Sequence, residues 1–121
     1  MESLLIVDDD INLCSVLKEE LAEVGYQVEY FNNGFYAFDY IENNPVDLML
    51  LDLKMPEHDG FDVLRELGKR NHRIKVIVLT GYADVKSAID SAKMGANDFI
   101  SKPYDFDELL ITIRKVLQAD D

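Results

Sequence analysis

The feature that most constrains this chain is a strict alternation of short apolar runs with segments of helical spacing. Apolar runs of strand length lie at residues 4–7, 28–31, 46–51, 74–79 and 98–100. Between them, apolar residues recur at intervals of three and four, which places side chains on one face of a helix. Runs that are apolar on both faces are typical of a parallel sheet buried between helices. The sequence therefore predicts an α/β fold: a doubly wound, five-stranded parallel sheet of (βα)5 type.

Polar residues and glycines mark the ends of the predicted helices. Asp10, Asp84 and Asp105 stand where N-caps belong, and Gly25 and Gly95 stand where helices end. Between these helix ends the sequence has no linker and no internal repeat. The 121 residues fit one domain of ordinary size, so we expect a single domain over residues 1–121.

Charge and hydropathy exclude several kinds of function. The chain has 24 acidic and 12 basic residues and a formal charge of −12, which argues against direct binding of nucleic acid. No apolar run approaches the roughly 20 residues of a membrane span, and the opening MESLL lacks the pattern of a secretory signal. We therefore expect a cytoplasmic protein without a membrane segment. Its single cysteine, Cys14, falls in a helical apolar pattern and is predicted to pack in the core.

The residues that carry chemistry follow the apolar runs. In a doubly wound sheet, ligands bind at the carboxyl ends of the strands. The residues at or just beyond four of these ends are Asp8, Asp9 and Asp10; Asp52; Thr80 and Gly81; and Lys102 and Pro103. Asp10 is predicted to be only the N-cap of the first helix. The others are expected to converge on one edge of the sheet.

Carboxylates gathered at one edge repel one another unless a cation joins them. Oxygen ligands of this kind suit Mg²⁺ or Mn²⁺, and Mg²⁺ typically takes one or two carboxylates together with phosphate oxygens. Asp52 is able to act as a nucleophile, while Thr80 and Lys102 are suited to phosphoryl oxygens. The pattern therefore predicts a metal-dependent phosphate site.

At this point the sequence resembles the response-regulator receiver family of two-component signalling. The matching pieces are LLIVDDD, MLLDLKMPEHDG, VIVLTGYAD and GANDFISKPYDFDEL, and the resemblance covers residues 2–118. It implies a flavodoxin-like sheet with strand order 2-1-3-4-5. It also implies that residues 1–121 form one receiver domain.

The resemblance assigns roles to individual residues. It implies that Asp52 is the phosphoacceptor and that Asp8, Asp9 and Asp52 hold the metal together with the backbone carbonyl of Lys54. Thr80 and Lys102 would contact the phosphoryl oxygens, and the peptide bond before Pro103 would be cis. Thr80 and Phe99 would form the switch pair, in which the hydroxyl moves toward the phosphoryl group as the ring turns inward. Without the family, Phe99 would be read as a core aromatic.

Two bulky residues at the rim are candidates for control of the phosphorylated lifetime. Lys54 lies two residues beyond Asp52, and Tyr82 lies two residues beyond Thr80. A long or aromatic side chain there would hinder a water that approaches the aspartyl phosphate in line. The alternative is that both are neutral surface residues.

The resemblance implies a sensor histidine kinase or phosphotransfer protein as phosphodonor. It implies an output domain or effector that contacts the fourth helix, the fifth strand and the fifth helix, with a role in transcription regulation, and it leaves open a phosphorylation-dependent homodimer. Other classes of protein fit the sequence less well. An aspartate-nucleophile phosphohydrolase would have a second Asp where Lys54 stands, and a flavin or nucleotide binder would not place Asp8 and Asp9 beside phosphate. A degenerate receiver that only docks partners is a further alternative.

Overall fold

The computed structural model describes residues 1–55, 60–70, 73–81 and 85–119. Within them the chain forms one parallel sheet with strand order β2-β1-β3-β4-β5, as predicted. The strands are β1 (Ser3–Val7), β2 (Gln27–Phe31), β3 (Leu48–Asp52), β4 (Lys75–Gly81) and β5 (Asp98–Lys102). Their ends differ by one or two residues from the predicted runs, because ladder hydrogen bonds also pair polar residues such as Gly81 and Lys102.

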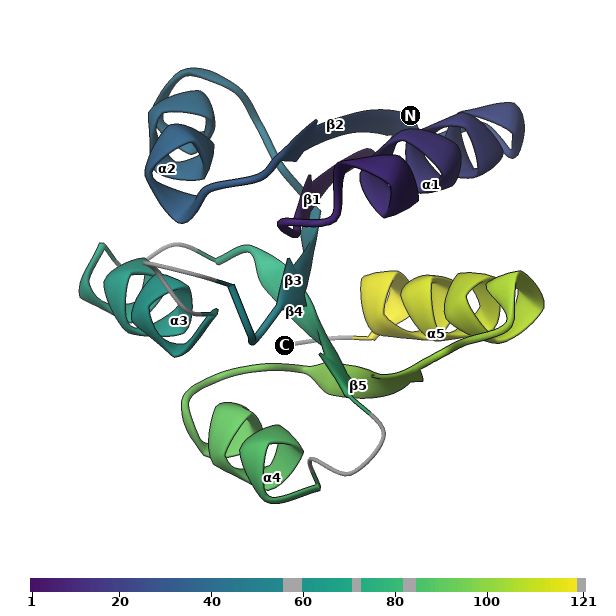
Figure 1. Cartoon of the computed structure of the whole chain (residues 1–121). Helices are drawn as coiled ribbons and strands as arrows, with labels where there is room; N and C mark the ends of the chain where they lie inside the picture. The colour runs from purple at the N-terminus through teal and green to yellow at the C-terminus, as the bar shows by residue number, and fades with distance from the viewer. Residues whose placement is uncertain (56–59, 71–72, 82–84, 120–121) are drawn as a thin grey trace.

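Helices alternate with the strands and cover both faces of the sheet. They are α1 (Ile11–Glu23), α2 (Gly34–Asn43), α3 (Gly60–Lys69), α4 (Val85–Lys93) and α5 (Phe106–Gln118). Figure 1 shows α1 and α5 on one face and α2, α3 and α4 on the other. The doubly wound α/β architecture predicted from the alternation is confirmed. None of the helices in the described ranges is long and apolar enough to cross a bilayer.

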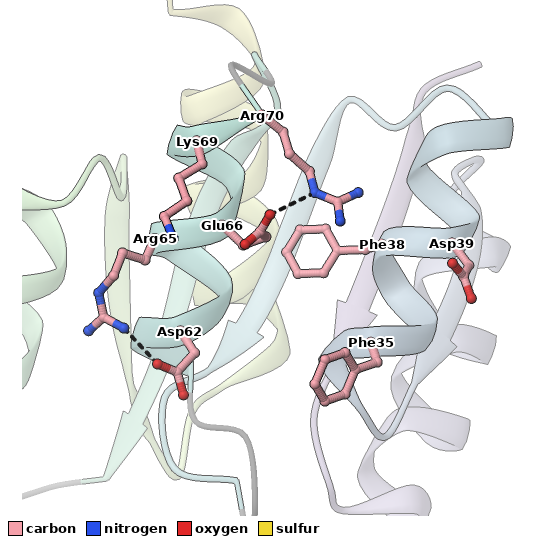
Figure 2. A pocket seen from close by; sticks show the side chains of 8 residues that line it. All are labelled: Phe35, Phe38, Asp39, Asp62, Arg65, Glu66, Lys69 and Arg70. Atoms are coloured by element: carbon pink, nitrogen blue, oxygen red, sulfur yellow. Dashed lines mark hydrogen bonds and ion pairs between the residues drawn. The ribbon is translucent and has the colours of Figure 1, made fainter.

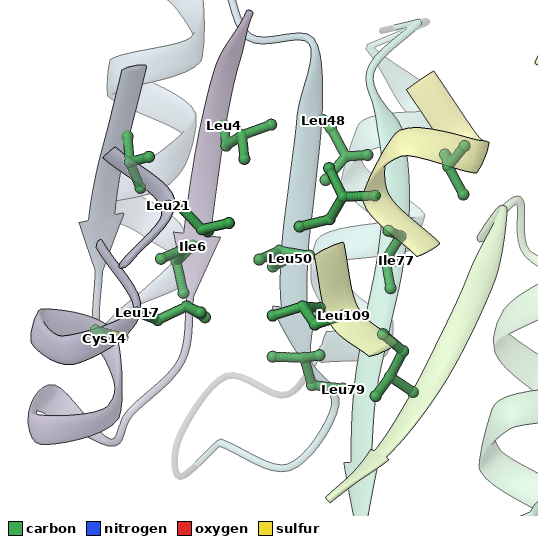
Figure 3. Packing of buried hydrophobic residues seen from close by; sticks show 14 residues of the cluster. Leu4, Ile6, Cys14, Leu17, Leu21, Leu48, Leu50, Ile77, Leu79 and Leu109 are labelled. Carbon is green, nitrogen blue, oxygen red and sulfur yellow. The ribbon is translucent and has the colours of Figure 1, made fainter. Parts of the chain in front are cut away.

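Two cores fill the space between the sheet and its helices, because side chains alternate between the faces of each strand. Leu4 and Ile6 of β1 point toward α1 and α5, whereas Leu5 and Val7 point toward α2 and α3. The neighbouring strands alternate in the same register, so their side chains stack into continuous layers. Figure 3 shows the first layer, where Cys14 is buried as predicted.

The helix ends follow the predicted signals where the structure describes them. The Asp10 carboxylate accepts a hydrogen bond from the Leu13 amide at 3.1 Å, and Asp105 caps α5 in the same way. Gly25 and Gly95 have positive φ angles of 106° and 108° just beyond α1 and α4, a conformation that a side chain would strain. The predicted cap at Asp84 lies outside the described residues.

Some apolar residues face solvent instead of the core. Of the aromatic residues in α2, Phe38 is buried and Tyr40 packs against Phe31, but Phe35 and Tyr36 are exposed. Packing therefore explains only part of the aromatic content of this helix. Phe99 is also exposed, because it lies on the outward face of β5, and its reading as a core aromatic is wrong.

Gly60 lets the start of α3 pack directly on the end of β3. A Cβ atom at this position would lie 2.6 Å from the backbone oxygen of Asp52 and 2.6 Å from the Cα atom of Leu53. The Gly60 amide also donates a hydrogen bond to the Leu53 carbonyl at 3.0 Å. The backbone that carries Asp52 is thus held by the first residue of the next helix.

We expect Gly60→Ala to destabilise the fold by about 2 kcal/mol or more, because backbone atoms must move to admit the methyl group. Gly68→Ala is the matched control, since a Cβ at Gly68 meets no atom within 4 Å and alanine favours a helix by roughly 0.5–1 kcal/mol. Urea denaturation measures both. Equal stabilities for the two variants would contradict the close approach at Gly60.

Candidate functional site

The strand order brings the predicted site residues to one edge of the sheet. Asp8 follows the last residue of β1, and Asp52 is the last residue of β3. Thr80 is next to the end of β4, and Lys102 ends β5. Because the four strands are parallel neighbours, these ends meet at their shared carboxyl edge, where open α/β sheets bind ligands.

Three carboxylates form a compact cluster at this edge. Asp8, Asp9 and Asp52 each place one oxygen within 4.8 Å of the others. Asp8 and Asp52 are buried, whereas Asp9 is exposed to solvent. The turn after β1 holds Asp8 in place, because its carboxylate accepts a hydrogen bond from the Asp10 amide at 3.0 Å. The cluster is therefore buried on one side and accessible to solvent on the other.

One lysine faces the cluster. The Nζ atom of Lys102 lies 2.8 Å from an oxygen of Asp8 and 3.8 Å from an oxygen of Asp52. Burial alone would lower the pKa of Lys102, but the hydrogen bond and the charge of Asp8, with those of Asp52 and Asp9, outweigh burial and raise it. Lys102 is thus protonated. The peptide bond that follows it, to Pro103, is cis.

The pKa of the Asp52 carboxyl group is raised by its surroundings. Burial raises its pKa from 3.8 to about 6, and the nearby charges of Asp8 and Asp9 act in the same direction. The Lys54 amide, which donates to the Asp52 carboxylate at 3.1 Å, and the ammonium of Lys102 oppose the rise without cancelling it. The carboxylate is therefore destabilised in the metal-free protein but is still mostly ionised at neutral pH.

The donor set fits a hard divalent cation. The side chains of the cluster offer carboxylate oxygens, the ligands that Mg²⁺ and Mn²⁺ prefer, and its exposed member, Asp9, leaves a way in from solvent. A divalent charge would also relieve the repulsion that raises the pKa of Asp52. The residues present could therefore hold the predicted metal.

The two predicted switch residues, Thr80 and Phe99, lie on the neighbouring strands β4 and β5. Thr80 is buried, and within the described residues its hydroxyl has no hydrogen-bond partner. Phe99 is 46% exposed on β5 beside β4. A buried hydroxyl without a hydrogen-bond partner destabilises the folded state, so the binding of an acceptor in the site would be favourable.

Two residues interact with Asp8 in a way that the sequence did not indicate. The Cys14 thiol donates a hydrogen bond to the Asp8 carbonyl at 3.5 Å, and burial raises its pKa to about 12. Burial also raises the pKa of Tyr104 to about 12, with a further contribution from Asp8. The apolar pattern predicted that Cys14 is buried, but no sequence signal links either side chain to Asp8.

Lys54 and Tyr82 were predicted at the rim of the site, and the structure describes only Lys54. The Lys54 side chain is exposed. Tyr82 lies outside the described residues. The structure thus gathers Asp8, Asp9, Asp52 and Lys102 at one edge, with Thr80 buried near the end of the adjoining strand.

An open sheet of this order, with polar side chains gathered at its carboxyl edge, defines the doubly wound class of ligand-binding domains. The sequence model of the response regulator receiver domain matches residues 4–114. The chain belongs to this family.

Individual relatives differ in how much of their length the chain spans. The chain is 40% identical over 114 residues to the transcriptional regulatory protein ZraR of Klebsiella oxytoca, covering 94% of this chain and 26% of that protein. It is 34% identical to sporulation initiation phosphotransferase F of Bacillus subtilis (strain 168), covering 96% of this chain and 94% of the relative. The non-phosphorylated HemR receiver domain from Leptospira biflexa superposes with a TM-score of 0.90 at 30% identity, covering 100% of this chain and 98% of that one. The chain thus spans about a quarter of the ZraR protein and nearly all of the phosphotransferase.

We expect the stability of the metal-free protein to depend on pH through Asp52. Its pKa of about 6 exceeds the usual 3.8, so the folded state binds this proton more tightly than the unfolded state. The resulting stabilisation is complete below about pH 4 and is lost as the pH rises through about 6. Asp52→Asn should therefore gain stability relative to wild type between these values, as melting curves in EDTA would measure. A difference in melting temperature that stays constant from about pH 4 to about pH 8 would contradict the raised pKa.

The buried hydroxyl of Thr80 leads to a prediction about stability. Thr80→Val keeps the shape and removes the group without a partner, so it should stabilise the unphosphorylated protein by roughly 1 kcal/mol or more. Thr112→Val is the control, because the Thr112 hydroxyl donates to the Glu108 carbonyl at 2.9 Å. Denaturant titration should show a gain for Thr80→Val only. A loss of stability in Thr80→Val would show that the hydroxyl has a partner in solution.

Proposed function

We propose that residues 1–121 are a phosphoacceptor receiver domain, which takes a phosphoryl group onto Asp52 from a sensor histidine kinase or a phosphotransfer protein. The observation that carries this proposal is the cluster of Asp8, Asp9 and Asp52 opposite the ammonium of Lys102. A domain of this kind is a signalling switch, and the only reactions it catalyses are its own phosphorylation and dephosphorylation.

The transfer itself is a displacement at phosphorus. An oxygen of the Asp52 carboxylate attacks in line, and the new O–P bond forms as the P–N bond to the donor histidine breaks, with its electron pair returning to the leaving imidazole. Asp8, Asp9, Asp52 and the carbonyl of Lys54 would hold Mg²⁺ or Mn²⁺, which neutralises charge on the phosphoryl oxygens. Lys102, 3.8 Å from Asp52 in the resting state, moves to an oxygen of the transferred group.

Phosphorylation then shifts the balance between two packings. The Thr80 hydroxyl, which has no partner among the described residues, turns toward the new phosphoryl oxygens. The ring of Phe99 leaves its exposed position and fills the space that this movement opens. The change would be read on the face formed by α4, β5 and α5, where Ile89, Phe99 and Ile111 are exposed.

The names of the relatives support a proposal for what the domain controls. ZraR is named a transcriptional regulatory protein and is about four times as long as the matched region, which supports an output domain in transcription regulation. The relative from Bacillus subtilis is named a phosphotransferase, which supports a relay role as the second candidate. In either case the partners would meet the α4-β5-α5 face, a phosphorylated homodimer could use the same face, and the protein would act in the cytoplasm.

The lifetime of the phosphorylated state is a further part of this proposal. The exposed side chain of Lys54 and the ring of Tyr82 would hinder in-line water at Asp52. A slow loss of phosphate would distinguish this domain from a phosphohydrolase, which must release its phosphate to turn over.

Incubation with acetyl phosphate and Mg²⁺ should add one phosphoryl group, seen by intact mass spectrometry. The label should disappear in Asp52→Ala and in EDTA, because the nucleophile and the metal are then missing. Asp10→Asn is the matched control: it alters a neighbouring carboxylate that caps α1 and should still be labelled.

Three other outcomes of this labelling experiment would each contradict a different part of the proposal. Equal labelling of wild type and Asp52→Ala would remove Asp52 from its role. Absence of label in wild type would favour a degenerate docking domain, and steady turnover of a generic phosphomonoester would favour a phosphohydrolase.

A further inference from the structure

A groove of about 440 Å³ lies between α2 and α3, away from the acidic cluster. Side chains from both helices line it, and none of them belongs to the candidate site described above. Figure 2 shows Phe35 and Asp62 at one end of the groove and Arg70 at the other. The proposed function leaves this face without a role.

Arg70 holds the two walls of the groove together. Its guanidinium pairs with Glu42 of α2 at 2.9 Å and with Glu66 of α3 at 3.0 Å. It also lies over the ring of Phe38, with 4.7 Å between the guanidinium carbon and the ring centroid. These contacts tie the far end of α3 to α2, so the groove is formed before any partner arrives.

The apolar surface on this face comes from aromatic side chains. Phe35 is 64% exposed and Tyr36 is 60% exposed, side by side in the first turn of α2. Aromatic residues at such exposure are enriched in protein interfaces, because a rigid ring buries a large area at a low cost in conformational entropy.

Both walls carry charged side chains. Figure 2 shows Asp39 on the side of α2 that faces away from α3, and Arg65, which pairs with Asp62 at 2.6 Å, on the side of α3 that faces away from α2. Lys69 adds a second cation to the α3 wall. Within the part of the chain that the structure describes, no residue pairs with the Asp39 carboxylate or with the Lys69 ammonium.

This arrangement is complementary to itself. Both helices run in the same direction, because each leads back from the carboxyl end of a parallel strand. A two-fold axis parallel to them lays α2 of one copy over α3 of the other and keeps each residue at its level along the helices. Phe35 then meets its own copy near the axis, and Asp39 comes within reach of Lys69 of the second copy on both flanks.

We propose that the face formed by α2 and α3 binds a second copy of this chain, with Phe35 at the centre and Asp39 and Lys69 paired across the interface. The surface is distinct from the α4-β5-α5 face and from the site around Asp52. The association therefore does not require phosphorylation. We expect it to be weak, since each copy carries a formal charge of −12.

Sedimentation velocity of the unphosphorylated chain over a wide range of concentration tests the proposal. At about 150 mM salt the Debye length is about 8 Å, so distant charges are screened while contact pairs persist. We expect a monomer–dimer equilibrium that Phe35→Ala weakens by at least about tenfold, equivalent to ~1.4 kcal/mol. Ile111→Ala is the matched control, because it removes an equally exposed apolar side chain from α5 and should change nothing.

A charge exchange separates specific pairing from net charge. Lys69→Glu and Asp39→Lys should each weaken the dimer, and the double variant, which has the net charge of wild type, should restore it. Asp39→Lys is the sharper case, because it lowers the net negative charge and would strengthen association if net repulsion alone decided. Lys93→Glu on α4 changes the charge as Lys69→Glu does but lies on another helix, and it should have no effect.

Several results would overturn the proposal. A monomer at every concentration would reject self-association. A dimer that Ile111→Ala disrupts and Phe35→Ala does not would place the contact on the α4-β5-α5 face. A double variant weaker than both single variants would reject the pairing of Asp39 with Lys69. Asp52→Asn should dimerise as wild type does, so a failure of the phosphorylation experiment leaves this test intact.

Discussion

The main constraint on this structure is an excess of negative charge at the carboxyl edge of its sheet, which the rest of the fold must hold in place. Asp8, Asp9 and Asp52 bring oxygens within 4.8 Å of one another, and the ammonium of Lys102 faces them. Burial and mutual repulsion raise the pKa of Asp52 to about 6. Such a cluster is stable only because the rest of the fold holds it in place. The charge it lacks is what a divalent cation would supply.

Close contacts to the backbone fix the positions of Asp8 and Asp52. Gly60 places α3 against the end of β3, and the Cys14 thiol and the Asp10 amide bind the turn that carries Asp8. Behind them, alternate side chains of the central strands fill two apolar layers. These layers supply the stability that offsets the electrostatic cost of the edge. The buried hydroxyl of Thr80, which has no hydrogen-bond partner among the described residues, is a second unsatisfied group that an arriving phosphoryl group would relieve.

The surface divides into faces with different exposed groups. The α4-β5-α5 face presents Phe99, which lies one strand from Thr80 and can respond to the acidic edge. The α2-α3 face has exposed rings and a groove that Arg70 holds open, and none of the described residues that line it belongs to the acidic cluster. In the proposed function, a partner on the first face would sense phosphorylation. In the proposed dimer, the second face would set assembly independently of phosphorylation.

The sequence by itself determined the five β-α units, the strand ends that carry Asp8, Asp52, Thr80 and Lys102, and the caps at Asp10 and Asp105. These features depend on local periodicity and hydrogen bonding, which neighbouring residues decide. Only the tertiary structure decided the 2.8 Å contact of Lys102 with Asp8, the burial of the Thr80 hydroxyl without a partner in the described part of the chain, and the outward ring of Phe99. Each of these involves residues that are far apart in the chain or on neighbouring strands, and periodicity carries no information on which side chains meet or on the burial that shifts a pKa.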